Sequence, residues 1–220
     1  MNGACRVSYR PARGRRLLVA LTAAVLMAGV SGCAANEPAV KVSAPSPSTY
    51  RGTELDPATP KPDITLTDTS GAPYSLRTAT KGRLAYLFFG YSNCPDVCPT
   101  TMADIAAALG KVPATDRAKT TVVFITVDPR RDTGPVLRAW LDRFDPSFVG
   151  LTGTDAQLAA AQQAAGVPLA EPEGTGEGYT VTHSAEVLAF SPDDRAHAVY
   201  LDGTSVSDYA HDLPLLLAKT

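Results

Sequence analysis

Apolar and polar residues follow one another in patterns that predict strands and helices from residue 61 to the end of the chain. Two nearly continuous apolar runs, 83–90 (RLAYLFFG) and 121–127 (TVVFITV), are typical of strands covered on both faces. Apolar residues at helical spacing predict helices through 102–109, 133–144, 155–165 and 205–218. Shorter apolar segments predict a strand at 148–151, a hairpin of 63–67 with 73–76, and a second hairpin of 186–190 with 196–201.

These elements follow the order ββ-β-α-β-α-β-α-ββ-α. Strands that alternate with helices favour a parallel sheet with helices on both faces, whereas strands joined by short turns pair antiparallel. The sequence therefore predicts a three-layer α/β sandwich with a mixed central sheet, parallel in its middle and antiparallel at one edge, and an extra hairpin. One domain over residues 61–220 accommodates the whole pattern.

The beginning of the chain is typical of an export signal. Residues 1–16 are rich in arginine, and residues 17–30 form an apolar run that is shorter than the roughly 18 to 20 residues a membrane span needs. We therefore expect residues 1–32 to be a cleaved signal peptide. Val30-Ser31-Gly32-Cys33 resembles the lipobox at which bacterial lipoproteins are cleaved and lipidated on the cysteine, although an ordinary signal peptide is the alternative. Arg15-Arg16 leaves export by the Sec or the twin-arginine route open.

Residues 33–60 read as a lipidated cysteine followed by a flexible tether. The segment after Cys33 is rich in Pro, Ser, Thr and Ala and holds few large apolar side chains. Such a segment buries too little surface to offset the entropy lost on ordering. The expected organisation is thus a lipoprotein signal peptide (1–32), a tether (33–60) and one folded domain (61–220).

Charge and cysteine content exclude two classes of protein. The formal net charge of the 220 residues is −2, but the first 32 residues hold five arginines and no acid, which leaves 15 basic and 22 acidic side chains in the remainder. A net charge of −7 excludes a nucleic-acid binder that works by neutralising phosphates. Four cysteines are too few for a disulfide scaffold. With Cys5 in the signal peptide and Cys33 lipidated, the exported domain keeps the thiols of Cys94 and Cys98.

Cys94 and Cys98 lie between the end of a predicted buried strand and the start of a helix. Open α/β sheets place binding sites at this edge. A spacing of four residues on a helical path brings both sulfurs to one side, and free backbone N–H groups at a helix start favour the thiolate. Outside the cytoplasm such a pair is either a disulfide or a site for a soft metal such as Cu(I). Two buried free cysteines are the structural alternative, which the polar, proline-rich loop disfavours.

Three segments together resemble the Sco/SenC family of exported copper proteins with a thioredoxin fold, which are implicated in assembling the dinuclear copper centre of cytochrome c oxidase. Residues 90–99 (GYSNCPDVCP) are similar to its C-x-x-x-C-P loop, residues 127–133 (VDPRRDT) to its D-P-x-x-D-T segment, and residues 179–184 (YTVTHS) to its histidine segment. The resemblance covers roughly residues 58–220. Asn93 and Gly134 depart from frequent family residues, and neither departure removes a ligand.

The resemblance implies that Cys94, Cys98 and His183 are copper ligands and that Asp128 and Asp132 lie near the site. From the residues alone, the two aspartates are equally well explained as a turn former and a helix N-cap. His197 falls on an outer hairpin strand and His211 on the terminal helix, so both are expected to be structural or solvated.

The resemblance further implies a copper metallochaperone that delivers copper, as Cu(I) or Cu(II), to the copper-centre subunit of cytochrome c oxidase, or primes the thiols of that subunit. Other copper carriers are a further class of partner. With Cys33 lipidated, the protein would be extracytoplasmic, attached to the outer face of the bacterial plasma membrane. Whether it is also an enzyme stays open. A thiol-disulfide oxidoreductase or peroxidase of thioredoxin fold is the alternative. The C-x-x-x-C spacing argues against a general reductase, and the lack of a further resolving cysteine argues against a peroxidase. A redox or copper sensor is a third hypothesis.

Overall fold

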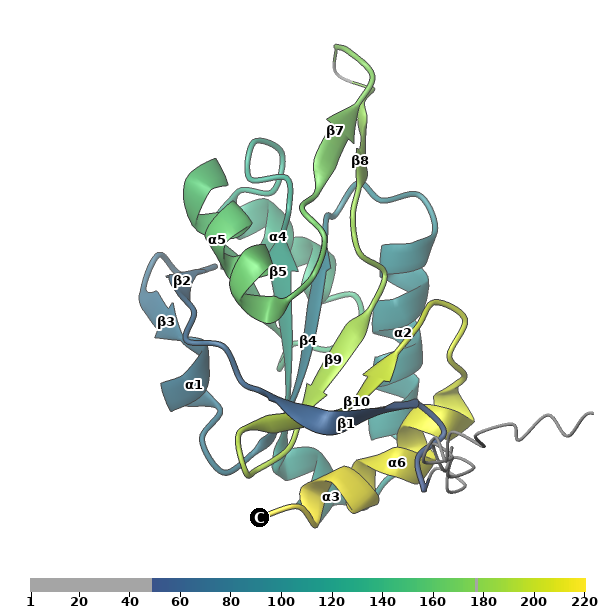
Figure 1. The fold of residues 1–220 in the computed structure, drawn as a ribbon. Helices are drawn as coiled ribbons and strands as arrows, with labels where there is room; N and C mark the ends of the chain where they lie inside the picture. The colour runs from purple at the N-terminus through teal and green to yellow at the C-terminus, as the bar shows by residue number, and fades with distance from the viewer. Residues whose placement is uncertain (1–48, 177) are drawn as a thin grey trace, which may run out of the picture. The chain divides into compact units, whose positions relative to one another are not determined.

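The computed structural model describes residues 49–176 and 178–220 (Figure 1). The expected signal peptide at 1–32 and the lipidation site Cys33 lie outside these residues. In the described part of the chain, no helix is both long and apolar enough to cross a membrane. The strands are β1 (Thr53–Pro60), β2 (Thr65–Asp68), β3 (Pro73–Ser75), β4 (Leu84–Gly90), β5 (Thr120–Thr126), β6 (Val149–Thr152), β7 (Glu171–Glu173), β8 (Thr180–Thr182), β9 (Val187–Phe190) and β10 (Arg195–Tyr200). The helices are α1 (Leu76–Ala79), α2 (Val97–Leu109), α3 (Ala114–Ala118), α4 (Gly134–Leu141), α5 (Asp155–Ala165) and α6 (Val206–Leu217).

Eight strands form one mixed sheet in the order β1-β10-β9-β4-β5-β6-β2-β3. The central pairs β4–β5 and β5–β6 are parallel, and the pairs on either side are antiparallel. The strands β7 and β8 pair antiparallel in a separate two-stranded sheet, which projects beyond the carboxyl ends of β4 and β5 in Figure 1. The predicted mixed α/β architecture is confirmed, but antiparallel pairs lie at both edges of the sheet and not at one edge as expected.

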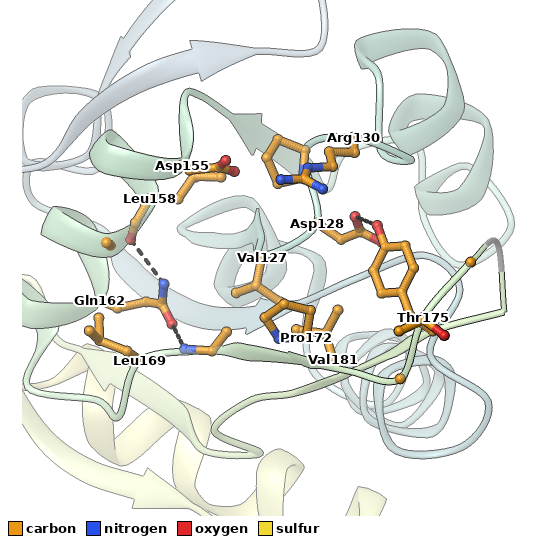
Figure 2. A pocket seen from close by; sticks show the side chains of 16 residues that line it. Val127, Asp128, Arg130, Asp155, Leu158, Gln162, Leu169, Pro172, Thr175 and Val181 are labelled. Carbon is orange, nitrogen blue, oxygen red and sulfur yellow. Dashed lines mark hydrogen bonds between the residues drawn. The ribbon is translucent and has the colours of Figure 1, made fainter.

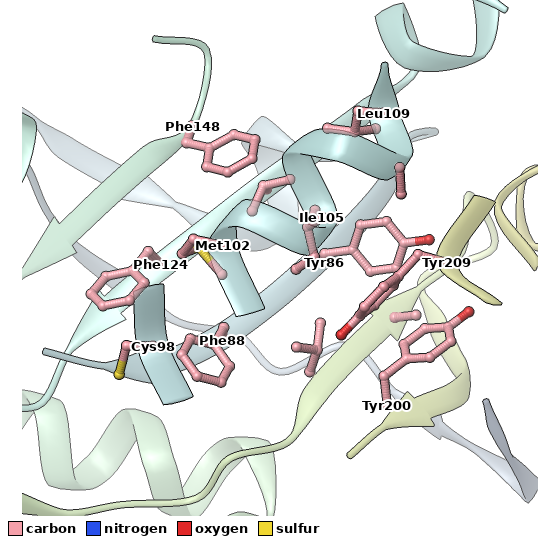
Figure 3. Packing of buried hydrophobic residues seen from close by; sticks show 14 of the residues in the cluster. Tyr86, Phe88, Cys98, Met102, Ile105, Leu109, Phe124, Phe148, Tyr200 and Tyr209 are labelled. Atoms are coloured by element: carbon pink, nitrogen blue, oxygen red, sulfur yellow. The ribbon is translucent and has the colours of Figure 1, made fainter. Parts of the chain in front are cut away.

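Helices cover both faces of the sheet because its central strands are apolar on both sides. All seven residues of β4 are buried. Leu84, Tyr86 and Phe88 face one core with side chains of α2, α4 and α6, as Figure 3 shows for part of this cluster. The alternate residues Leu87 and Phe89 face a second core with α1 and α5. This three-layer arrangement leaves the carboxyl end of β4 open to the loop that carries the cysteines.

The expectation of a tether up to residue 60 is wrong for its last part. Residues 53–60 form β1, which pairs antiparallel with β10 at the edge of the sheet. The strand is held mainly by backbone hydrogen bonds, and its side chains Leu55 and Ala58 are half-buried. Just before it, the backbone N–H groups of Arg51 and Gly52 donate to the buried carboxylate of Asp212 on α6, at 2.9 Å each. Composition does not reveal an edge strand whose stability comes from the backbone rather than from apolar side chains.

Most predicted elements occur within one to three residues of their expected ends. The hairpins β2–β3 and β9–β10 and the helix α5 are confirmed, and Gly166 ends α5 in a left-handed conformation at φ 72°. Helix α4 stops at Leu141 rather than 144 because the next residues tighten into turns, with Phe144 N–H donating to the Leu141 carbonyl at 2.9 Å. The short helices α1 and α3 and the pairing of β7 with β8 were not predicted.

Candidate metal centre

Cys94 and Cys98 lie where β4 passes into α2. A turn closed by Cys94 N–H donating to the Tyr91 carbonyl at 3.1 Å follows the strand, and Cys98 is the second residue of the helix. Asp96, the residue at the N-cap, makes no side-chain cap hydrogen bond. Instead, the Cys98 backbone N–H donates to Cys94 Sγ at 3.4 Å. A free amide of the first helical turn is therefore aimed at a cysteine sulfur, where it favours the thiolate form.

Gly90, the last residue of β4, makes room for the buried thiol. A Cβ atom at this position would lie 2.7 Å from Cys98 Sγ and within 3.0 Å of ring atoms of Phe88 and Phe124. Such contacts are closer than any that packed atoms maintain, so a larger residue would displace the sulfur. Figure 3 shows Cys98 beside Phe88 at the end of the aromatic core. The position of one thiol is thus fixed by packing against the rigid centre of the fold.

His183 reaches the same place from a different part of the chain. It follows β8, and its Nε2 atom lies 3.3 Å from Cys98 Sγ and 3.9 Å from Cys94 Sγ. Its Nδ1 lies 2.7 Å from the Ser184 carbonyl oxygen, which accepts a hydrogen bond and so assigns the proton to Nδ1. The ring stands edge-on to Tyr91, with centroids 5.6 Å apart. A proton held on Nδ1 leaves the Nε2 lone pair free to bind a metal.

The two sulfurs and the imidazole nitrogen lie within 4.8 Å of one another. Donors that surround a single first-row ion at bond lengths of about 2.0–2.3 Å are separated by about 3–4 Å, so the three atoms need little adjustment. Two thiolates and an imidazole are the donors that select copper or zinc over magnesium or calcium. His197 and His211 lie elsewhere, paired with Asp193 and Asp212 at 2.8 Å each.

The environments of the two thiols push their pKa values apart. A hydrogen bond from the Cys98 thiol, opposed by partial burial and aided by His183 and by backbone N–H groups, lowers the pKa of Cys94 to about 4. Burial, together with its hydrogen bond to Cys94 and the charge on that residue, raises the pKa of Cys98 well above its usual range. The pair without metal therefore carries one negative charge at neutral pH, on Cys94.

Asp132 connects the cysteine loop to β5. Its carboxylate is fully buried and accepts hydrogen bonds from the Ser92 backbone N–H at 3.0 Å, from the Ser92 hydroxyl, and from the Thr126 hydroxyl at 2.6 Å. No carboxylate joins the group of Cys94, Cys98 and His183 among the described residues. Asp132 thus lies near the site but supports the loop. Helix α4 begins at Gly134, and its N-cap residue Thr133 makes no side-chain cap hydrogen bond.

Asp128 contacts the start of the histidine strand, which comprises residues 179–183 and includes β8. The Tyr179 hydroxyl donates to its carboxylate at 2.6 Å, and Arg131 forms an ion pair with it. Arg131 also donates to the Tyr179 carbonyl at 2.9 Å and stacks on the Tyr179 ring, with the guanidinium carbon 3.7 Å from the ring centroid. Sequence analysis did not single out Arg131. Its position inside the 127–133 segment was the available signal, but an arginine between acidic residues is usually explained as a solvated charge.

The comparisons with known proteins agree with this geometry. The family model described as SCO1/SenC matches residues 53–218, which is most of the chain. The chain belongs to the SCO1/SenC family. The match begins where β1 begins, so the family domain includes the edge strand.

Two solved structures of Sco proteins and two sequence relatives illustrate the similarity. ScoI of Bradyrhizobium japonicum, solved with copper bound, is 34% identical, with a TM-score of 0.64 over 73% of this chain and 100% of that chain. Apo Sco1 of Thermus thermophilus is 32% identical, with a TM-score of 0.69 over 76% of this chain and 97% of that chain. A protein of Stutzerimonas stutzeri that is named for copper binding is 39% identical over 60% of this chain and 64% of the relative. The matched region spans 43% of the mitochondrial yeast relative SCO2.

This SCO1/SenC protein also has a groove of about 600 Å³ on the α5 side of the sheet (Figure 2). Val127, Leu158 and Leu169 contribute apolar surface to it. Gln162 is held in its wall, because its side chain donates to the Leu158 carbonyl at 3.1 Å and accepts from the Ala170 N–H at 2.7 Å. The groove is not lined by Cys94, Cys98 or His183, so the candidate metal centre is a separate feature.

Proposed function

We propose that this protein binds one copper ion through Cys94, Cys98 and His183 and delivers it to the copper-centre subunit of cytochrome c oxidase or to another copper carrier. The observation that carries the proposal is the approach of two sulfurs and one imidazole nitrogen to within 4.8 Å of one another. Membership of the SCO1/SenC family and the copper-bound structure of ScoI support the choice of metal.

The donor set suits copper as a cargo in either oxidation state. Cu(I) is soft and prefers thiolates, so Cys94 and Cys98 supply the donors it favours. Cu(II) prefers a nitrogen donor beside sulfur and more than two ligands, which gives His183 its role. The low pKa of Cys94, about 4, means that this sulfur is already a thiolate before metal arrives, whereas Cys98 releases its proton on binding.

The same proposal places the domain outside the cytoplasm, attached to the outer face of the membrane through a lipid on Cys33. The support is the short apolar run at 17–30 followed by small residues before the cysteine. A Cys33→Ala variant should be processed abnormally or released from membranes. Equal membrane retention of the variant and the parent protein would contradict the lipid anchor without affecting the copper site.

Copper content after reconstitution tests the metal site. Reduced protein should hold one copper per domain, and protein with a Cys94–Cys98 disulfide should hold much less because a disulfide offers no thiolate. His183→Ala should weaken Cu(II) binding and shift the thiolate-to-copper absorption band, while Cu(I) binding suffers less. His197→Ala and His211→Ala are the matched controls, and each should behave as the parent. A control that damages Cu(II) binding more than His183→Ala would place the ligands elsewhere.

Thiol-disulfide exchange is the second candidate function, and the state of Cys94 favours it. Cys94 is partly exposed and has a lowered pKa, while Cys98 is buried directly behind it. In such an exchange the Cys94 thiolate attacks a disulfide sulfur of the partner and displaces one partner thiolate. Cys98 then loses its proton, attacks Cys94 Sγ and releases the second partner thiol, so the pair is oxidised by two electrons. Retention of this activity by His183→Ala would separate it from Cu(II) binding.

A further inference from the structure

The strand β8, which leads to His183, is not part of the main sheet. Among the residues that the structure describes, β7 and β8 pair only with each other, in a two-stranded sheet of three residues each. The position of His183 over the two thiols is therefore not fixed by the eight-stranded ladder that fixes the end of β4. Contacts made by side chains must hold the histidine strand in place.

Arg131 supplies several of these contacts at once. Its guanidinium pairs with Asp128, donates to the Tyr179 carbonyl at 2.9 Å and lies 3.7 Å from the centroid of the Tyr179 ring. The Tyr179 hydroxyl closes the arrangement by donating to Asp128 at 2.6 Å. Tyr179 immediately precedes β8, so these contacts hold the strand at the end opposite to His183.

A second aromatic ring joins Arg131 to the histidine itself. The guanidinium carbon lies 5.6 Å from the centroid of Tyr91. Tyr91 packs edge-on against the His183 ring, and its hydroxyl accepts from the Val181 backbone N–H at 3.3 Å. Arg131 thus contacts both the strand that leads to His183 and the ring that packs against it.

The segment 128–132 links the two halves of the metal centre. Asp132 binds the cysteine loop through Ser92, and Arg131, one residue before it, binds the histidine strand. We propose that Arg131 is a positioning residue that sets the approach of His183 to the two thiols. The inference rests on the proposed copper binding and adds to it a residue that is not itself a ligand. The planar fork of arginine matters here, because a lysine cannot bind the carboxylate, reach the carbonyl and stack on the ring together.

Replacement of Arg131 should therefore act on the histidine ligand selectively. Loss of a residue that orients a metal ligand typically lowers metal affinity about 10- to 100-fold. For Arg131→Gln we expect a loss of this size in Cu(II) affinity, a weaker imidazole nitrogen coupling in the electron paramagnetic resonance spectrum, and a smaller change for Cu(I). In the protein without metal, the ring signals of His183 should shift or broaden in an NMR spectrum. Arg130→Gln, an exposed neighbour, is the matched control and should resemble the parent.

A double-mutant cycle separates positioning from a general effect on the fold. In a His183→Ala background, Arg131→Gln should cause little further loss of Cu(II) affinity, because the ligand on which Arg131 acts is gone. An equal loss in both backgrounds, or Cu(II) affinity and nitrogen coupling unchanged in Arg131→Gln, would overturn the proposal. If Arg131→Gln does not fold, Arg131→Lys provides the same comparison and should still weaken Cu(II) binding. A parent protein that binds no copper would instead refute the proposed function.

Discussion

The unequal pKa values of the two thiols predict an unusual pH dependence of alkylation in the reduced, metal-free protein. An ordinary cysteine with a pKa of about 8.5 is about 1% thiolate at pH 6.5, whereas Cys94, with a pKa of about 4, is almost fully ionised. The thiolate fraction of Cys94 is thus about 100-fold higher. Nucleophilicity falls by about 0.4–0.5 log units for each unit of pKa, which offsets this gain almost completely over about 4.5 units.

The absolute alkylation rate at pH 6.5 therefore does not distinguish Cys94 from an ordinary thiol. The dependence of that rate on pH does. Between pH 5.5 and 7.5 an ordinary thiol should react about 90-fold faster as it ionises, whereas the rate for Cys94 should change by less than about two-fold. Cys98 should stay unmodified because its thiol is buried and its pKa is raised. The assay is a timed reaction with iodoacetamide, followed by mass spectrometry of the peptides that hold each cysteine.

Two outcomes would refute this reasoning. One is a rate for Cys94 that rises with pH like that of an ordinary thiol, and the other is faster modification of Cys98 than of Cys94. Cys98→Ala is the informative variant, because the Cys98 thiol is the largest contributor to the low pKa of Cys94. In that variant the pKa of Cys94 should rise, and its alkylation should become steeper with pH. His197→Ala should leave the profile flat.

Further predictions concern the supports of the site. Gly90→Ala should lower the free energy of unfolding by about 1–3 kcal/mol through overpacking, and it should weaken copper binding by displacing Cys98. Gly178→Ala is the control and should cost little, because a Cβ at this position would have nothing within 4 Å. Equal denaturation midpoints of the two variants would contradict this prediction. Asp132→Ala should destabilise the protein by about 2–4 kcal/mol, because it leaves buried donors without an acceptor, and urea unfolding measures the loss. Asp212→Ala should release residues 51 and 52 from α6, seen as faster amide hydrogen exchange there and not in β4; unchanged exchange would show that the carboxylate does not hold the strand.

The central part of the fold was predictable because its signals are local. The apolar runs that form β4 and β5 predict strands buried on both faces. Gly166 marks the end of α5, where it adopts a left-handed conformation. The cysteine loop was located from the same logic, as a strand-to-helix junction at the carboxyl edge of a sheet. The strand β1 escaped prediction because its backbone pairing with β10 joins residues 135 to 146 positions apart, and no local pattern encodes such a partner.

The candidate site shows the same division. Cys94 and Cys98 were recognisable from their spacing, but the approach of His183 depends on a separate hairpin and rested on family resemblance. The sequence left the aspartates ambiguous between cap, turn and site. The structure gives Asp132 a buried role beneath the cysteine loop, and it makes Asp128 the partner of Tyr179 and Arg131. Sequence patterns identify polar residues but not which hydrogen bonds they form across 40 or 50 positions.

If the protein is anchored through Cys33 as proposed, the inclusion of β1 in the fold shortens the distance that the domain can reach from the bilayer. If the chain is lipidated at Cys33, the part between the lipid and residue 61 would extend to at most about 95 Å as a free tether. Because Arg51 and Gly52 are bound to α6, at most the residues from 33 to about 49 would lie between the lipid and the fold, which sets an upper limit of about 55 Å on that distance. A partner that receives copper would therefore have to hold its own ligands close to the same bilayer surface. Their distance from that surface could not exceed the length of this segment plus the diameter of one small domain.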